Sequence, residues 1–223
     1  MVQSKNPMMK TANSPINKTG AFYARDREYS IWLVPTGPAR LRLRGQIATL
    51  SKKHGTPDFE PHVTLVGLGA VPPESGEGLE GRIARLAGAL RPFDVHLREV
   101  GQLDAFFRSL FVKVEPTPDV MRAGEMGRRL FKEVHQKEPA DPEYFPHLSL
   151  LYSDLAADEK QKIISTELAD LGVRDDRSPI NIAFEVSKLE IRDTATRDTR
   201  NWRLLRELPL ARPPSRRALE KKA

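Results

Sequence analysis

Two five-residue segments, Pro61-His62-Val63-Thr64-Leu65 and Pro146-His147-Leu148-Ser149-Leu150, share one pattern and set the fold expected of this chain. Each reads proline, histidine, apolar residue, hydroxyl residue, leucine, and the two histidines are 85 residues apart. Side chains along a β-strand alternate between its faces, so the histidine and the hydroxyl share one face while the apolar residues pack behind them. If the two strands are neighbours, two imidazoles and two hydroxyls converge.

Helices and strands alternate on both sides of these segments. Apolar periodicity and turn residues predict strands over 29–35, 62–68, 93–100, 106–114, 147–152, 180–191 and 202–208, and helices over 38–54, 79–90, 118–135 and 158–171. Each half of the chain contains a strand–helix–strand unit that ends in one of the histidine segments. This weak internal symmetry indicates two lobes that face a shared groove.

The paired histidines and hydroxyls suit phosphodiester hydrolysis without a metal. Opening a cyclic phosphate requires water to lose a proton on one side of phosphorus and the leaving oxygen to gain one on the other. The pKa of histidine lies near neutrality, so His62 and His147 can hold opposite protonation states and perform both steps. Thr64 and Ser149 can hydrogen-bond the non-bridging oxygens, where negative charge builds in the transition state.

The histidines allow two other interpretations. A single histidine in an apolar strand is more often a buried structural residue, but two in the same local frame favour catalysis. A zinc site needs about three protein ligands, whereas the chain has no cysteine, no HxH or HExxH, and no carboxylate at alternate positions to His62 or His147 within the predicted strands. We therefore expect neither a metal nor a cofactor. His54, His96 and His135 are expected to be structural, and Trp202 is expected to lie in the core.

The basic residues of the chain are concentrated at its ends. Of the net charge of +6, residues 1–28 contribute +3 and residues 211–223 contribute +4, which leaves −1 for residues 29–210. We expect a disordered basic leader over 1–28, one domain over 29–210 and a disordered basic tail over 211–223. No apolar run reaches the ~18–20 residues of a membrane span. With no secretory signal in view, a cytoplasmic monomer is expected, although the basic N-terminus leaves a transit peptide open.

At its two motifs the chain resembles the 2H phosphoesterase superfamily and, more narrowly, the plant and fungal cyclic phosphodiesterases. The resemblance covers most of residues 29–202. It is carried, beyond the motifs, by the segments Tyr29–Trp32, Phe59–Pro61, Phe106–Arg108, Thr117–Glu125 and Tyr144–Tyr152. The resemblance implies an α+β, bilobal fold with two pseudo-symmetric lobes of antiparallel sheet and outer helices around a central groove.

The resemblance also implies a substrate and a set of site residues. The substrates would be nucleoside 2′,3′-cyclic phosphates, opened to 2′-phosphates, and ADP-ribose 1″,2″-cyclic phosphate, a by-product of tRNA splicing, opened to ADP-ribose 1″-phosphate. His147 would activate water and His62 would protonate the leaving ribose oxygen, with Thr64 and Ser149 beside them. The substrate-contacting aromatic residues would be Trp32, Tyr152 and Phe107.

Two alternatives remain open. The first is a 2H enzyme that acts on RNA ends, either 2′,3′-cyclic or 2′-5′ linked. The near-neutral body argues against it, because long RNA is usually held by a basic track. The second is a nucleotide-binding module that keeps the fold without turnover, and the presence of both histidines and both hydroxyls argues against that.

Overall fold

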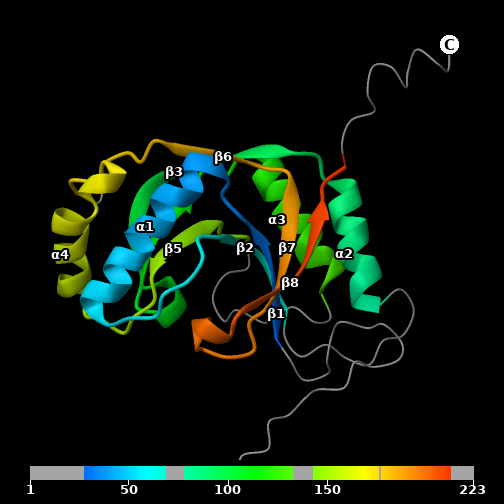
Figure 1. Ribbon diagram of the computed structural model, residues 1–223. Coiled ribbons are helices and arrows are strands. Elements are labelled where there is room, and N and C mark those ends of the chain that lie inside the picture. The colour runs from blue at the N-terminus through cyan, green and yellow to red at the C-terminus, as the bar shows by residue number, and fades with distance from the viewer. Residues whose placement is uncertain (1–27, 69–77, 133–142, 176, 212–223) are drawn as a thin grey trace, which may run out of the picture.

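A computed structural model describes residues 28–68, 78–132, 143–175 and 177–211 of the chain. In these residues one curled antiparallel sheet of eight strands has the order β6-β3-β4-β5-β2-β1-β7-β8 and is flanked by four α-helices (Figure 1). The strands are β1 (Tyr29–Leu33), β2 (Val63–Leu68), β3 (Phe93–Gln102), β4 (Leu110–Val114), β5 (His147–Leu151), β6 (Ile182–Val186), β7 (Lys188–Asp193) and β8 (Arg203–Pro209). The helices are α1 (Gly37–His54), α2 (Gly78–Ala89), α3 (Pro118–Leu130) and α4 (Ala157–Glu167), with short 3-10 turns η1 (Phe106–Arg108), η2 (Ala169–Leu171) and η3 (Thr199–Asn201).

The sheet divides into two equivalent halves that meet between β2 and β5. One half has the order β8-β7-β1-β2 and the other β6-β3-β4-β5. The units β1-α1-β2 and β4-α3-β5 correspond, and Val63 of β2 is paired with Leu148 of β5 at the seam. The expected α+β fold with two pseudo-symmetric halves of antiparallel sheet is confirmed.

Each histidine-bearing strand carries a β-bulge at the leucine of its motif. The pairing of β1 with β2 steps from Ile31–Val66 to Trp32–Thr64 and skips Leu65. The pairing of β4 with β5 skips Leu150 in the same way. A bulge adds one residue to one strand and changes which face the following side chains occupy. The bulges therefore interrupt the alternation after each leucine, so that the consecutive residues Leu65 and Val66, and likewise Leu150 and Leu151, are both buried.

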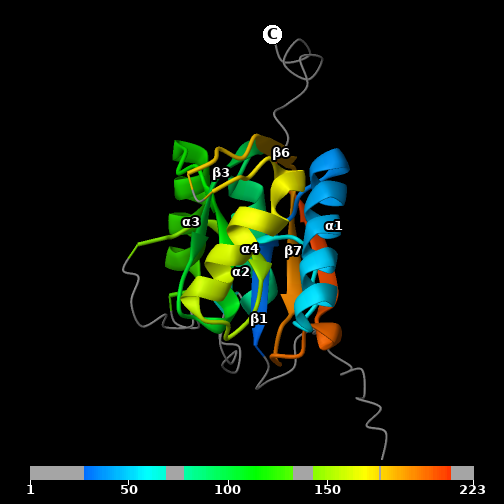
Figure 2. The ribbon, with the colours of Figure 1, turned by 90° about the vertical axis from the view of Figure 1, so that its left-hand side faces the viewer.

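The first helix of each unit packs on the opposite half of the sheet. Helix α1 follows β1 but contacts β5 and β6, while α3 follows β4 but contacts β2 as well as β3. The two helices stand at opposite flanks of the molecule (Figure 2). Because α1 and α3 cross the seam in opposite directions, they tie the halves together around it.

Local sequence signals set the helix ends. Helix α1 has Pro38 in its first turn, where the missing N–H costs nothing, and it ends at Gly55 with φ of 63°. Helix α3 begins after Thr117, whose side chain accepts a hydrogen bond from the Val120 N–H. These signals explain why the predicted starts of both helices match the structure within one residue.

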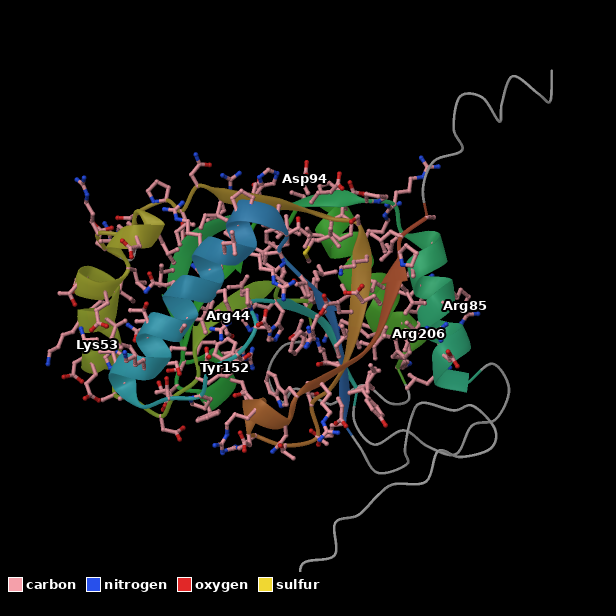
Figure 3. All side chains as sticks on the ribbon, viewed as in Figure 1. Arg44, Lys53, Arg85, Asp94, Tyr152 and Arg206 are labelled. Carbon is pink, nitrogen blue, oxygen red and sulfur yellow. The ribbon has the colours of Figure 1, made fainter. Side chains whose placement is uncertain are left out.

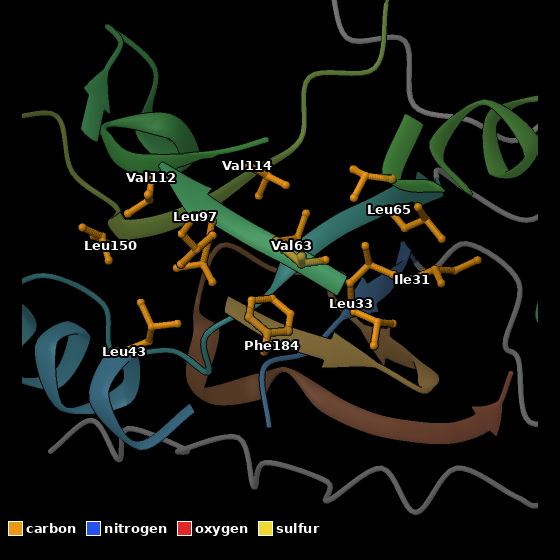
Figure 4. Packing of buried hydrophobic residues seen from close by; sticks show 14 of the residues in the cluster. Ile31, Leu33, Leu43, Val63, Leu65, Leu97, Val112, Val114, Leu150 and Phe184 are labelled. Carbon is orange, nitrogen blue, oxygen red and sulfur yellow. The ribbon is translucent and has the colours of Figure 1, made fainter. Parts of the chain in front are cut away.

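Apolar side chains from both halves form one continuous core. Val63 of β2 lies near Leu33 of β1, and Leu97 of β3 and Phe184 of β6 belong to the same cluster (Figure 4). Val63, Leu33 and Leu97 are at most 1% exposed. The face of the seam behind the histidines is thus fully packed, which leaves the other face to form the site.

The structure corrects two of the predicted strands. Residues 106–114 form the η1 turn followed by β4 rather than one strand. Residues 180–191 form two strands, because the chain passes at Ser187 from β6, beside β3, to β7, beside β1. Two predicted helices are also shorter: α3 ends at Leu130, and residues 158–171 divide into α4 and η2. The expected basic leader, up to residue 27, and the tail from residue 212 lie outside the described residues.

Candidate active site

A groove of about 220 Å³ lies over the seam between β2 and β5. All seven site residues predicted from the sequence line it: His62, Thr64, His147, Ser149, Trp32, Phe107 and Tyr152. Extending the antiparallel Val63–Leu148 pair by one residue sets His62 across from Ser149 and Thr64 across from His147. The register of two central strands therefore brings the two motifs together on one face.

The two histidines are held by equivalent hydrogen bonds. The Nδ1 atom of His62 is 2.7 Å from the carbonyl oxygen of Glu60, and Nδ1 of His147 is 2.9 Å from that of Phe145. A carbonyl oxygen only accepts, so Nδ1 carries the proton in both rings. Each neutral imidazole therefore keeps its lone pair on Nε2, which is the nitrogen left for proton transfer to or from a substrate.

An aromatic residue from the neighbouring strand packs on each histidine. The ring of Trp32 stacks on His62 with centroids 3.5 Å apart and planes 5° apart. Phe111 contacts His147 with its ring edge-on, at 5.3 Å and 66°. The two aromatic residues hold equivalent positions, because Trp32 pairs with Thr64 and Phe111 pairs with Ser149. The two halves thus place an aromatic residue at the same position beside each histidine, but one ring is stacked and the other is edge-on.

The two histidines also differ in their surroundings. His62 is 5% exposed, whereas His147 is only half-buried. The pKa of His62 is lowered to about 3, chiefly by burial and also by the positive charge of Arg192 and that of His147 when it is protonated, against the opposing effect of the hydrogen bond to the Glu60 carbonyl. His62 is therefore neutral at pH 7 in the free protein.

The hydroxyl of Ser149 belongs to a buried network. Its Oγ donates to the carbonyl oxygen of Phe107 at 2.9 Å, and it also hydrogen-bonds the phenol of Tyr152. Tyr152 stacks on Phe59 with centroids 3.8 Å apart and lies toward the middle of the molecule (Figure 3). Burial raises the pKa of Tyr152, so its phenol stays protonated and can donate to an anion.

Thr64 lies on the opposite side of the seam and is half-buried. Its carbonyl oxygen accepts a hydrogen bond of 3.1 Å from the phenol of Tyr144, which precedes β5. This bond joins the first motif to the segment that leads into the second.

Trp202 was expected in the core, and this expectation is wrong. It is only partly buried and lines the groove, with its ring 6.2 Å from Phe107 and 6.0 Å from Tyr152. Its indole N–H donates to the carbonyl oxygen of Thr196 at 2.7 Å. The sequence feature that could have indicated its exposure is its position at the end of a polar connection, one residue before β8 begins.

The groove has further lining residues that sequence reasoning missed. They include Arg108, Arg128, Glu143, Tyr144 and Phe145. Their types follow no pattern within their own elements, and only the folded arrangement brings them to the site.

Two of the other histidines lie outside the groove, as their expected structural role requires. His54 pairs with Glu167 at 2.9 Å, and His96 lies on β3. His135 lies outside the described residues. Within the described ranges, no three side chains of the histidine, aspartate or glutamate type are grouped to hold a metal ion, and none of the described helices is long and apolar enough to span a membrane.

The sequence that forms this site matches the model of a known family. The family model described as cyclic phosphodiesterase-like protein matches residues 28–210. The chain belongs to this family. The resemblance to the cyclic phosphodiesterases, hydrolases of the 2H phosphoesterase superfamily, is thereby confirmed.

Two curated relatives carry the same kind of name. The chain is 25% identical to the cyclic phosphodiesterase of Arabidopsis thaliana over 170 residues, which cover 76% of this chain and 87% of that protein. It is 28% identical to the 2′,3′-cyclic-nucleotide 3′-phosphodiesterase of Yarrowia lipolytica, with 63% of this chain and 81% of that protein covered.

Solved structures support the family fold. The TT0787 protein of Thermus thermophilus superposes with a TM-score of 0.59 at 18% identity, covering 84% of this chain and all of that one. LigT of E. coli, solved with phosphate, gives a TM-score of 0.51 at 20% identity, covering 84% of this chain and 99% of that one. At these identities the likeness concerns the fold alone.

Proposed function

We propose that this protein hydrolyses ribose cyclic phosphates without a metal, with His62 and His147 as the general acid–base pair. The proposed reactions open nucleoside 2′,3′-cyclic phosphates to 2′-phosphates and ADP-ribose 1″,2″-cyclic phosphate to ADP-ribose 1″-phosphate. The observation that carries the proposal is the matched presentation of two imidazoles across one seam, each with Nδ1 fixed by a backbone carbonyl and Nε2 left for chemistry. The names of the two curated relatives support the substrate class.

In this mechanism a water loses a proton to one Nε2 and attacks phosphorus, while the other Nε2–H protonates the departing ribose oxygen. One P–O bond forms as the ring P–O bond breaks, so the product is a phosphate monoester. The hydroxyl of Thr64 donates to one non-bridging oxygen, and that of Ser149 turns from the Phe107 carbonyl to donate to another, which stabilises the charge that builds there. Tyr152, which stays protonated and bonds Ser149, supports that donor from behind.

We assign water activation to His147 and protonation of the leaving oxygen to His62. The exposure of the two rings supports this split, because His147 is partly open to solvent and can meet a water molecule. His62 is buried beside Trp202, at the side where Phe107 and Trp202 offer aromatic surface to a base. Since His62 is neutral in the free protein, its acid role requires the anionic phosphate to raise its pKa on binding.

The test is turnover of adenosine 2′,3′-cyclic phosphate by His62→Ala and His147→Ala. Loss of one proton-transfer group lowers kcat by about 10²–10⁴-fold, and circular dichroism should show that both variants remain folded. His96→Ala is the matched control, because His96 lies on β3 away from the groove. A folded His62 or His147 variant that turns over like His96→Ala would rule out the two-histidine mechanism. Parallel assays on ADP-ribose 1″,2″-cyclic phosphate and on cyclic-ended RNA would rank the substrates.

A further inference from the structure

Both faces of the Trp32 indole are occupied within the protein. The imidazole of His62 covers one face at 3.5 Å and almost parallel. The guanidinium carbon of Arg192 lies 5.0 Å from the ring centroid, over the ring. A second group cannot share the face that a parallel ring covers at 3.5 Å, so Arg192 lies on the other one. Trp32 is also only 1% exposed. The indole therefore offers no face to a nucleotide base, contrary to the role expected from its sequence position.

Arg192 is fixed in place by its neighbours on two strands. Its Nε and Nη2 atoms donate to the same carboxylate oxygen of Glu190, at 3.1 and 2.6 Å, and Glu190 is only 1% exposed. In the register of β1 and β7, Glu190 pairs with Trp32 and Arg192 pairs with Ser30. Ser30 in turn accepts a hydrogen bond of 2.6 Å from the Trp32 indole N–H. Glu190 thus holds the guanidinium of Arg192, and Ser30 holds the indole of Trp32. Together they fix a stack of guanidinium, indole and imidazole.

The other half of the sheet serves as an internal comparison. Phe111 corresponds to Trp32, and its partner across β3 is Gly101 where Trp32 has Glu190. Two residues further along these strands, Leu103 lies across from Ser109 where Arg192 lies across from Ser30. His147 therefore has a glycine and a leucine behind its aromatic neighbour, whereas His62 has a carboxylate and a guanidinium. At these two equivalent positions, charged side chains stand behind His62 and uncharged residues behind His147.

We propose that Arg192 and Trp32 are positioning residues for His62: they clamp its ring in a fixed plane and place a positive charge behind it, where the equivalent positions behind His147 hold a glycine and a leucine. This proposal rests on the proposed function for its consequence but not for its geometry. Trp32 touches the catalytic side chain, and Arg192 acts on it through Trp32.

Besides burial, three groups shift the pKa of His62. They are Arg192 on β7, His147 on β5 and the backbone carbonyl of Glu60 before β2. The carboxylate of Glu190 faces Arg192 and lies on the far side of the indole. Arg192 and protonated His147 oppose a proton on His62, and the carbonyl of Glu60 favours one. Removing the charge of Arg192 must therefore raise the pKa of His62.

As a consequence, His62 becomes protonated when the substrate binds. While the groove is empty, burial and Arg192 keep His62 neutral. The phosphate of a cyclic nucleotide brings negative charge to the other side of the imidazole, which favours its protonation. The stack thus distinguishes two histidines that the fold would otherwise present alike, and it reserves the acid form of His62 for the complex.

The test is an NMR titration of the His62 ring in the free protein and in its complex with adenosine 2′-phosphate. Arg192→Gln should raise the proton affinity of His62 about tenfold in both states, since the two charged groups are separated by one aromatic ring. Arg192→Lys should shift it less, because it keeps the charge but loses the planar stack. Lys188→Gln is the matched control, because Lys188 lies on the same strand and pairs with the same Glu190 at 3.6 Å but does not lie over Trp32. It should leave the titration of His62 unchanged.

Kinetics separates this role from a substrate contact. A positioning residue predicts that Arg192→Gln lowers kcat about tenfold with KM within about twofold of the wild type. A raised KM with an unchanged His62 titration would mean that Arg192 binds phosphate, and it would overturn the proposal. An unchanged His62 titration in a folded Arg192→Gln protein overturns it as well. The free-protein titration needs no turnover, so its outcome is independent of whether the proposed hydrolysis is correct.

Discussion

The close contact between α3 and Tyr144 predicts that Gly124→Ala destabilises the protein. A Cβ atom at Gly124 would lie 2.1 Å from Cδ1 of Tyr144 and 2.5 Å from Cγ and Cε1. The ring cannot simply swing away, because its hydroxyl donates to the carbonyl oxygen of Thr64 at 3.1 Å. The added methyl must therefore displace either the helix or a residue that braces the first catalytic motif.

Three free-energy contributions decide whether Gly124→Ala stabilises or destabilises the protein. Replacing a helical glycine by alanine gains up to ~1 kcal/mol of intrinsic helix stability. Overpacking a filled contact costs ~1–3 kcal/mol, and loss of the Tyr144 hydrogen bond adds ~1 kcal/mol. We expect a net loss of ~1–3 kcal/mol in the free energy of unfolding. A shift of Thr64 should also lower kcat about tenfold, since small displacements in a site are costly.

Urea unfolding followed by far-UV circular dichroism measures this difference, with the slope of the transition checked for constancy. Gly45→Ala is the matched control, because Gly45 is also inside a helix and a Cβ there meets nothing within 4 Å. It should gain ~0.5–1 kcal/mol. If Gly124→Ala is as stable as Gly45→Ala, the packing of Tyr144 against α3 does not constrain the helix.

Three further predictions concern the chemistry and the ends of the chain. Activity should survive EDTA, because both proposed proton-transfer groups are side chains; loss of activity that zinc or manganese restores would indicate a metallohydrolase. A nitrophenyl phosphodiester, whose leaving group needs no proton, should restore much of the rate to His62→Ala but not to His147→Ala, and the reverse pattern would exchange the two roles. Deleting residues 1–26 and 213–223 should leave kcat/KM for a mononucleotide almost unchanged; a loss confined to RNA-sized substrates would favour an RNA-end enzyme instead.

Local pattern was sufficient for most elements and for the central residues of the groove. The alternation around His62 and His147 correctly placed each imidazole on the face opposite to the packed Val63 and Leu148. Capping residues marked the helix ends because their signals act within one turn. These features depend on contacts between near neighbours, which a single sequence records.

The errors arose where distant pairing decides the structure. In residues 180–191 the buried positions are even-numbered up to Val186 and odd-numbered at Leu189 and Ile191, where only the ion-paired Glu190 departs from the alternation. That change of parity marks the break at Ser187, but only the pairing of β6 with β3 and β7 with β1 shows that the chain there changes halves. For the same reason, Trp202 reaches the groove and Arg192 reaches Trp32 only in the folded sheet.

The exchange of α1 and α3 across the seam restricts how the groove can respond to a ligand. Opening the two halves like a hinge would pull α1 away from β5 and α3 away from β2, and it would expose apolar surface on both sides at once. Each half also depends on the helix of the other half to cover part of its sheet. Differences in ligand size must therefore be accommodated by side chains such as Phe107, 38% exposed at the groove, rather than by closure of the halves.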